Sequence, residues 1–378
     1  MFFIKNFIVI FCISIFYSTP SYSIKVKSDY AFLIDYSSGQ VLFEKNPDKR
    51  IFPASMSKLM TLYVLFDYLE TGVISMSDEF FISENAWRKG GAMSDSSTMF
   101  AEVSSYISIE NLIKGIVIHS GNDACIAIAE GISGSEELFA TEMNFLSQKI
   151  GMKKSNFVNS TGLHNDEHYS TARDLVILAK SLIKNFPQYY YFFSEKDFTW
   201  NGIFQPNRNN LLTGGIGVDG LKTGRTNQSG YSMIVSSLSG GNRLVGVLGG
   251  LSSKKSRTSE MKKLISYGQK GFKRFTVFKA QDSIVEAKVW GGKYNKVNLT
   301  VAEDINLFLD IRGRRLLNAK YSFSEPIIAP VKKGQYIGKI SILNDNIIVA
   351  ESDLISKQGI KGKSIIGRTL ESIRYLIN

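Results

Sequence analysis

Residues 53–70 read PASMSKLMTLYVLFDYLE, and this stretch decides the fold. From Met56 to Leu69 apolar residues fall on every side of a helix, and Thr71-Gly72 ends the pattern. A helix that is hydrophobic all round is buried in the middle of a fold. The other elements of the domain must therefore surround it.

The segments on both sides of this helix predict a sheet and more helices. The stretch YAFLIDYSSGQVLFEKN (30–46) has two apolar runs about a Ser-Ser-Gly turn, which indicates a β-hairpin. Two more strands, 231–237 and 243–249, flank a Ser-Gly-Gly-Asn turn. Helices are expected over roughly 109–118, 123–132 and 136–150, after Ser170, and over 259–267. Together they indicate an α+β domain around an antiparallel sheet.

Beyond about Lys279 the helical periodicity disappears. Short alternating stretches at 283–290, 296–301, 306–311 and 339–343 are separated by turn residues. A chain of 378 residues is long for one domain. We therefore expect a large domain over residues 24–278 and a small all-β domain over residues 279–355.

The N-terminus, MFFIKNFIVIFCISIFYSTPSYS, has the pattern of a signal peptide over residues 1–23. Lys5 is followed by an apolar run and then by the small residues Ser21 and Ser23 at the expected cleavage site. The apolar run is too short to span a bilayer comfortably. A cleaved signal predicts export, whereas an uncleaved membrane anchor or a buried helix is the alternative.

The C-terminal tail, residues 356–378, has the pattern of an amphipathic helix. Its apolar residues, Ile366, Leu370, Ile373 and Ile377, fall on one face, and the segment is rich in Lys and Arg. Such a helix binds an anionic membrane surface. Because the tail has no Trp or Phe, a helix packed on its own domain is an equal alternative.

Composition fits an ordinary globular protein, with 44% hydrophobic and 21% charged residues. The formal net charge of +11 favours anionic partners such as lipid head groups, wall polymers or a substrate carboxylate. We find no clustered basic stripe with interleaved aromatics, so nucleic acid is not an expected partner. Cys12 leaves with the signal peptide, and Cys125 alone cannot form an internal disulfide.

A first candidate site lies at the head of the buried helix, where Ser55 and Lys58 are three residues apart. This spacing brings the hydroxyl and the amine within hydrogen-bonding reach. Burial lowers the pKa of a lysine, and a neutral amine can take the proton of a serine. Ser181/Lys184, Ser252/Lys255 and Ser259/Lys262 have the same spacing, but only Ser55 and Lys58 begin a buried helix.

Two more motifs follow along the chain. Ser120-Gly121-Asn122 separates two apolar helices; it is either an interhelical turn capped by Asn122 or Asp123, or a proton relay with an amide for the substrate or Lys58. Lys222-Thr223-Gly224 lies on the strand before the Tyr231 strand. A glycine there leaves an edge strand open to an extended peptide, and Lys222 and Thr223 can meet a carboxylate.

These motifs, in this order, are the signature of penicillin-binding proteins and class A β-lactamases. The stretches DYSSGQVLFEKNPDKRIFPASMSKLMT, IHSGNDACIAIAE, GLHNDEHYSTARDL and GVDGLKTGRTNQSGYSMI resemble those of the low-molecular-mass penicillin-binding D-Ala-D-Ala carboxypeptidases. The β-rich domain and the tail also match that family's organisation. The resemblance therefore extends over essentially the whole mature chain.

The resemblance implies a serine hydrolase that trims peptidoglycan stem peptides ending in D-Ala-D-Ala and is acylated by β-lactams. It implies a β-lactamase/transpeptidase-like domain over 24–278, a β domain that holds it off the membrane, and a periplasmic location on the inner membrane. Ser55 would be the nucleophile, Lys58 the base, Ser120 the relay and Lys222 the carboxylate ligand. No metal or organic cofactor is implied.

Arg225 departs from the best-known form of the family, which has histidine after Lys-Thr-Gly. By the family pattern the backbone N–H groups of Arg225 and Ser55 would form an oxyanion hole, which needs no particular side chain. The Arg225 guanidinium is a candidate second ligand for the substrate carboxylate. The three histidines, His119, His164 and His168, are expected to be structural or surface groups, and Cys125 to be a buried small residue.

Three rival functions deserve comparison. A β-lactamase needs a deacylating glutamate, for which Glu167 is the candidate, but its surroundings LHNDEHYST resemble the carboxypeptidases. A DD-endopeptidase would use the same chemistry with a different leaving group. A catalytically silent wall-binding protein would not need Ser55 and Lys58 together.

Overall fold

The computed structural model describes residues 24–310, 313–367 and 369. The signal peptide expected over residues 1–23 and most of the amphipathic tail lie outside these residues. Within them, no helix is both long enough and apolar enough to cross a membrane.

The larger unit is organised around a five-stranded antiparallel sheet with the order β2-β1-β9-β8-β7. The hairpin β1 (Tyr30–Asp35) and β2 (Val41–Lys45) is present as predicted. The predicted strands on either side of the Ser-Gly-Gly-Asn turn are β8 (Gly230–Ser239) and β9 (Asn242–Leu251). Strand β7 (Val218–Thr226), which contains Lys222, lies at the edge of the sheet.

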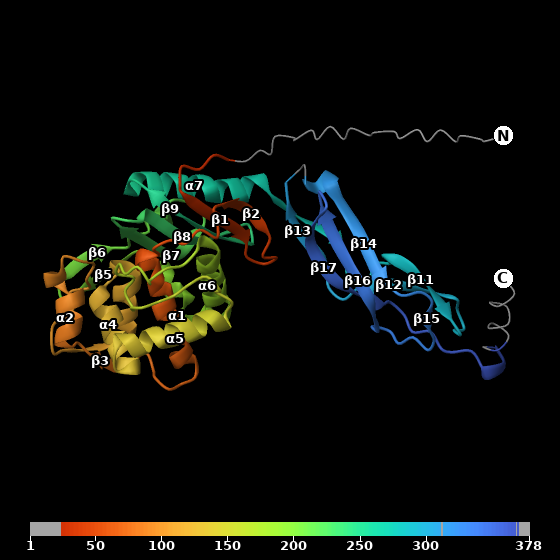
Figure 1. Ribbon diagram of the computed structural model, residues 1–378, viewed down its shortest axis with the longest axis horizontal. Helices are drawn as coiled ribbons and strands as arrows, with labels where there is room; N and C mark the ends of the chain where they lie inside the picture. The colour runs from red at the N-terminus through yellow and green to blue at the C-terminus, as the bar shows by residue number, and fades with distance from the viewer. Residues whose placement is uncertain (1–23, 311–312, 368, 370–378) are drawn as a thin grey trace, which may run out of the picture.

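Helices cover both faces of this sheet (Figure 1). The predicted central helix is α1 (Lys58–Glu70), which continues from a 3-10 turn, η1 (Ala54–Ser57). Every side chain from Lys58 to Phe66 is buried, as its uniform hydrophobicity predicts. On the opposite face, α7 (Lys254–Gly271) packs through Met261, Leu264 and Ile265.

The remaining elements of this unit surround α1 and the edge strand. The helices are α2 (Glu84–Gly90), η2 (Ala92–Ser94), α3 (Ile109–Lys114), the π segment η3 (Gly115–His119), α4 (Asn122–Ser133), α5 (Glu136–Lys149), α6 (Ala172–Asn185), η4 (Pro187–Ser194) and η5 (Asn210–Thr213). Strand β3 (Glu79–Phe81) pairs antiparallel with β4 (Tyr106–Ser108) across the segment that contains α2, and β5 (Asp197–Trp200) forms a short hairpin with β6 (Ile203–Pro206).

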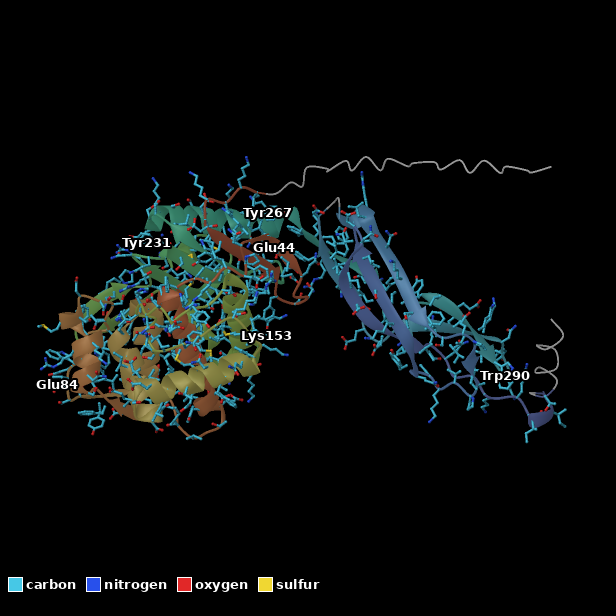
Figure 2. All side chains as sticks on the ribbon, viewed as in Figure 1. Glu44, Glu84, Lys153, Tyr231, Tyr267 and Trp290 are labelled. Carbon is cyan, nitrogen blue, oxygen red and sulfur yellow. The ribbon has the colours of Figure 1, made fainter. Side chains whose placement is uncertain are left out.

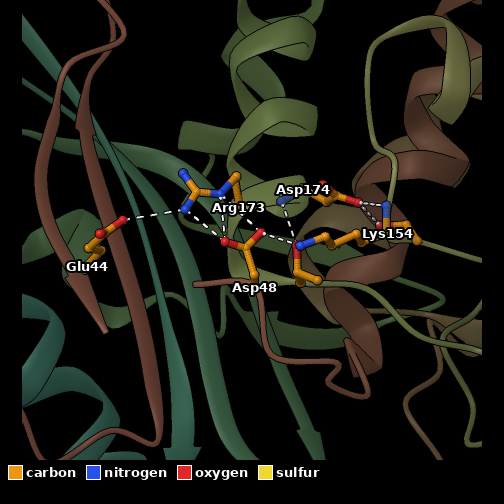
Figure 3. A network of polar contacts seen from close by, with 7 residues as sticks. Glu44, Asp48, Lys154, Arg173 and Asp174 are labelled. Atoms are coloured by element: carbon orange, nitrogen blue, oxygen red, sulfur yellow. Dashed lines mark hydrogen bonds and ion pairs between the residues drawn. The ribbon is translucent and has the colours of Figure 1, made fainter. Parts of the chain in front are cut away.

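A polar network fixes the first hairpin to α6 (Figure 3). Asp48 accepts from Arg173 at 2.9 Å and from Lys154 at 3.3 Å, and Arg173 reaches Glu44 on β2 at 3.5 Å. Asp174 accepts from the backbone N–H of Lys154 at 2.8 Å. The network therefore connects the strand, the segment before α1 and the helix.

The second unit contains only strands and one 3-10 turn, η6 (Gly313–Leu316), among its described residues up to Gly362. Its six-stranded sheet has the order β14-β16-β17-β12-β11-β15 and a separate hydrophobic core. The strands are β11 (Val285–Trp290), β12 (Lys296–Val301), β14 (Leu317–Phe323), β15 (Ile327–Ile328), β16 (Tyr336–Asn344) and β17 (Ile347–Ser356). An all-β fold for this part of the chain is confirmed.

The passage from one unit to the other differs in detail from the sequence prediction. Strand β10 (Lys273–Phe278) lies before Lys279 and pairs with β13 (Ile305–Leu309). Phe308 on β13 packs into the core beneath α7, where its ring stacks on Phe272. A domain boundary at residue 279 stays a prediction.

Candidate active site

Ser55 and Lys58 meet at the start of the buried helix. Ser55 lies in η1 and Lys58 is the first residue of α1, and the Lys58 Nζ is 3.3 Å from the Ser55 Oγ. Ala54 has a φ of +53°, a left-handed conformation that is uncommon for residues other than glycine. The chain is therefore held in a costly conformation directly before Ser55.

Lys58 is fully buried and has two further acceptors. Its Nζ lies 2.6 Å from Asn122 Oδ1 and 2.5 Å from the carbonyl oxygen of Thr161. Burial lowers the pKa of Lys58 to about 8, as the sequence predicted in direction. No carboxylate oxygen of the described residues is hydrogen-bonded to this amine.

Ser120 and Asn122 reach the site from the junction of η3 and α4. Ser120 has a φ of +62°, and its buried Oγ has no hydrogen-bond partner among the described residues. Asn122 begins α4 but does not cap it; its amide contacts Lys58 and, at 3.0 Å, the Ser96 Oγ. The interhelical-cap interpretation is therefore wrong for Asn122, because its side chain is turned towards Lys58.

Asp123 has a role that the sequence did not reveal. Its carboxylate accepts from the Thr98 Oγ1 at 2.6 Å and from the backbone N–H groups of Met99 and Ala101 at 3.0 Å each. It therefore fixes the loop that contains Ser96 beside Asn122. The only sign of this role in the sequence was an acidic residue directly after Ser-x-Asn. An N-cap at Asp123 would explain the same residue equally well.

Strand β7 closes the other side of the site. A Cβ added at Gly224 would lie 2.7 Å from the Ser232 Oγ, 3.1 Å from the Pro53 carbonyl oxygen and 3.3 Å from the Ala54 Cβ. Glycine is therefore required because β7 approaches η1 closely. The sequence argument, that glycine leaves the edge strand open, did not foresee this contact.

Lys222 and Thr223 are both buried at this edge. The only hydrogen bond of the Lys222 Nζ within the described structure is a long one, 3.5 Å, to the Thr223 carbonyl oxygen. Burial, followed by the neighbouring charges of Lys58 and Arg208, lowers the pKa of Lys222 well below its ordinary value. Within the described residues, the Lys222 amine is thus buried without an anionic partner.

Two arginines that the sequence analysis missed extend this positive region. Arg208 donates to the Ser97 Oγ at 2.6 Å, and Arg257 on α7 donates to the Arg208 carbonyl oxygen at 3.3 Å. Arg257 is buried, and its Nε has no partner among the described residues. Neither arginine belongs to a local motif, so only the fold could reveal their convergence.

Comparison with known proteins decides the family. Residues 17–252 match the model of the D-alanyl-D-alanine carboxypeptidase family, and residues 272–362 match the penicillin-binding protein 5 C-terminal domain. The chain belongs to the D-alanyl-D-alanine carboxypeptidase family. Its Ser-x-x-Lys, Ser-x-Asn and Lys-Thr-Gly motifs thus lie in the fold that the resemblance implied.

Relatives of this carboxypeptidase family match over almost the full chain. The D-alanyl-D-alanine carboxypeptidase DacC of Escherichia coli is 37% identical, over 90% of this chain and 86% of its own length. DacA of Haemophilus influenzae is 38% identical, over 88% and 86%. The structure of penicillin binding protein 5 from Haemophilus influenzae has a TM-score of 0.78 at 37% identity, covering 89% of this chain and 98% of its own.

The other three residues considered from the sequence of this carboxypeptidase, Arg225, Glu167 and Cys125, differ in exposure and contacts. Arg225 is exposed, and its guanidinium stacks over the Tyr231 ring at 5.1 Å. The Glu167 side chain is 71% exposed and pairs with Arg50 at 3.8 Å, as a surface group does. Cys125 is fully buried, as the sequence predicted, and burial raises the pKa of its thiol to about 12.

The histidines are structural, and one of them supports the site. His119 is buried and contacts the Phe198 carbonyl oxygen at 2.9 Å, whereas His164 packs against the Phe52 ring. His168 is buried with its Nε2 at 2.8 Å from the Ser57 Oγ, and its Nδ1 accepts from the Val158 N–H at 3.3 Å. His168 thus joins the segment before Thr161 to the turn that contains Ser55.

Proposed function

We propose that this protein removes the terminal D-alanine from peptidoglycan stem peptides ending in D-Ala-D-Ala, through an acyl-enzyme on Ser55. The observation that carries the proposal is the buried Lys58 amine, which lies between Ser55 and two fixed acceptors. The reaction is serine-type hydrolysis without histidine.

The acceptors around Lys58 suit a general base. A neutral amine has two hydrogens and one lone pair. Donation to Asn122 Oδ1 and to the Thr161 carbonyl oxygen uses both hydrogens, which leaves the lone pair for the Ser55 hydroxyl. With a pKa of about 8, about a tenth of the enzyme has a neutral Lys58 at pH 7.

The buried cationic region suits the substrate terminus. Lys222 and Arg208 have no acidic partner within the described residues, so a substrate carboxylate would supply the missing negative charge. An extended peptide can hydrogen-bond to β7 because that strand is at the edge of the sheet. Thr223 and Arg225 are the further candidate ligands on this strand.

The chemical steps follow from this placement. Lys58 takes the Ser55 proton as the serine oxygen bonds to the penultimate carbonyl carbon, and the backbone N–H groups of Ser55 and Arg225 stabilise the oxyanion. The peptide C–N bond then breaks, and Ser120 passes the proton held by Lys58 to the nitrogen of the departing D-alanine. The unpartnered Ser120 Oγ is consistent with a role that needs a substrate group beside it. Water finally hydrolyses the ester.

β-Lactams are expected to acylate the same serine, because their strained amide and carboxylate resemble the substrate terminus. Glu167 does not favour a β-lactamase, since its exposed carboxylate pairs with Arg50. A DD-endopeptidase would differ only in the leaving group. Product analysis with cross-linked and linear peptides therefore separates these two activities.

Export to the periplasm and a peripheral position on the outer face of the inner membrane belong to the same proposal. The signal-like residues 1–23 and the cationic, amphipathic tail of residues 356–378 support it. Removing the residues after Gly359 should release the protein from membranes. Retention of the shortened protein would contradict the anchor.

The decisive experiment measures the mass of the purified protein after incubation with penicillin, together with D-alanine release from a peptide ending in D-Ala-D-Ala. We expect one adduct on Ser55 and free D-alanine, and neither product with Ser55→Ala. An enzyme that turned over penicillin without cleaving the peptide would be a β-lactamase. Absence of both adduct and D-alanine in the unmodified protein would indicate a wall-binding protein.

A further inference from the structure

The outer face of α7 has an unusual excess of positive charge. Helix α7 has six Lys or Arg residues, all exposed except Arg257, and one acid, Glu260, whereas the whole chain has 45 basic and 34 acidic residues. Nitrogen-tipped side chains project from α7 on the side away from the sheet (Figure 2). The excess is therefore local and lies on one surface.

The fold adds a second segment to this surface. The Lys263 Nζ donates to the Lys25 carbonyl oxygen, which brings the chain before β1 alongside α7. We define the basic strip as the exposed lysines of these two segments: Lys25, Lys27, Lys254, Lys255, Lys262, Lys263 and Lys270. The sequence could not show this strip, because its two parts are more than 200 residues apart.

In the part of the chain that the structure describes, no carboxylate forms an ion pair with the basic strip. Glu260, the only acid on α7, is buried and accepts from the backbone N–H of Lys27 at 2.9 Å. None of the seven lysines forms an ion pair with a described residue. Lys254 and Lys255 occupy the first turn of α7, where the helix dipole disfavours positive charge.

The shape of the basic strip indicates its partner. From Lys254 to Lys270 the helix extends about 24 Å, so a matching partner must present several negative charges along its length. No large hydrophobic residue of α7 is exposed, so the helix has nothing to insert between lipid tails. Lysine ammonium groups are compact charges that can donate to carboxylates in many orientations. A long, flexible polyanion fits better than a lipid surface.

We infer that the basic strip binds the polymer that bears the substrate peptides, as a docking surface distinct from the active site. This inference rests on the proposed function, in which each stem peptide ends in a carboxylate and the polymer is therefore a polyanion. Helix α7 and α1 lie on opposite faces of the sheet (Figure 1), so the strip would hold stems other than the one being cut. Binding there would raise the local concentration of substrate without touching the chemistry.

The test compares binding of the full chain to insoluble peptidoglycan, freed of protein and other polymers, at low and at physiological salt. The strip variant replaces Lys254, Lys255, Lys262 and Lys263 with Gln. The control variant replaces four exposed lysines outside the basic strip with Gln. They lie on or just after α2, α5 and α6: Lys89, Lys149, Lys153 and Lys184. Both variants lose the same net charge, and neither changes a residue of the site.

We expect the strip variant to bind the polymer at least about fivefold more weakly at low salt, with the difference reduced by added salt. The control variant should bind like the unmodified protein. Both should release D-alanine from a soluble peptide at the unmodified rate. The proposed function is tested separately by that soluble reaction, which does not involve the strip.

Three outcomes would overturn the inference. Equal losses in both variants would mean that only the net charge matters, and unchanged binding of the strip variant would mean that the strip does not bind this polymer. If the strip variant bound the polymer normally but no longer bound vesicles containing an anionic phospholipid, the partner would be a lipid surface instead.

Discussion

Lys58 illustrates how a few contacts determine reactivity at the scale of single residues. Burial favours the neutral amine. Because Asn122 Oδ1 and the Thr161 carbonyl oxygen accept its two hydrogens, the lone pair of the amine points towards Ser55. A carboxylate in place of Asn122 would have favoured the charged amine instead. The amide therefore leaves part of the Lys58 population neutral near neutral pH, as the proposed base requires.

This balance predicts a pH dependence. Acylation by penicillin should rise about tenfold per pH unit below the Lys58 pKa of about 8 and level off above it, because only the neutral amine accepts the proton. Asn122→Asp should move this rise to higher pH by adding a negative charge beside the ammonium. Stopped-flow measurement of adduct formation between pH 6 and 10 tests both expectations. An unshifted profile in the variant would contradict the assignment of Lys58 as base.

His168 provides a second prediction at this scale. Burial lowers its pKa from 6.5 to about 4, so the native state favours the neutral ring. The free energy of unfolding should therefore be highest above pH 6.5 and should fall by about 3 kcal/mol as the pH falls towards 4. The sign follows because the unfolded chain binds the proton more tightly.

Replacement of His168 isolates that effect. His168→Gln should flatten the pH dependence between 6.5 and 4, and denaturant titrations at both ends of the range measure it. His168→Ala should also lower stability at pH 7.5 by about 1 to 3 kcal/mol, because the Ser57 hydroxyl and the Val158 N–H lose their partner. His164→Gln, at a partly exposed position, is the matched control.

At the scale of elements, the contact between β7 and η1 sets the width of the site. Gly224→Ala would place a methyl group against the Ser232 Oγ and the Pro53 carbonyl oxygen, so the strand must move away from Ser55. We expect penicillin acylation to fall at least about tenfold, since small displacements in catalytic groups have large effects on rate. Gly271→Ala, where the nearest atom is 3.7 Å away, should leave the acylation rate unchanged.

The elements also show what the sequence can and cannot predict. Helix α1 and the hairpin β1–β2 were predictable because their residues have strong local patterns. The contacts of Asp123 and His168, and the convergence of Arg208 with Lys222, depend on segments far apart in the chain. Strand β10 was missed because α7 runs to Gly271, directly before it, and leaves no turn signal between them.

At the scale of the whole molecule, the two units have separate cores, and Phe308 of the β unit packs into the core of the larger unit beneath α7. We expect a protein ending at Gly271 to be acylated by penicillin at a rate within about twofold of the full chain, because every proposed site residue precedes that point. Its free energy of unfolding should fall by about 3 to 5 kcal/mol when the Phe308 ring is lost. Complete loss of acylation in a folded, shortened protein would show that the β unit shapes the site.

The unpaired buried cations affect the molecule as a whole. Lys58, Lys222 and Arg257 are removed from water with no hydrogen-bonded acid among the described residues to offset the loss of hydration, so the empty site weakens the fold that contains it. A bound carboxylate reverses part of this cost. The protein should therefore melt at a higher temperature when a substrate or an antibiotic fills its site. In cells without either ligand, a larger fraction would be unfolded and open to proteolysis.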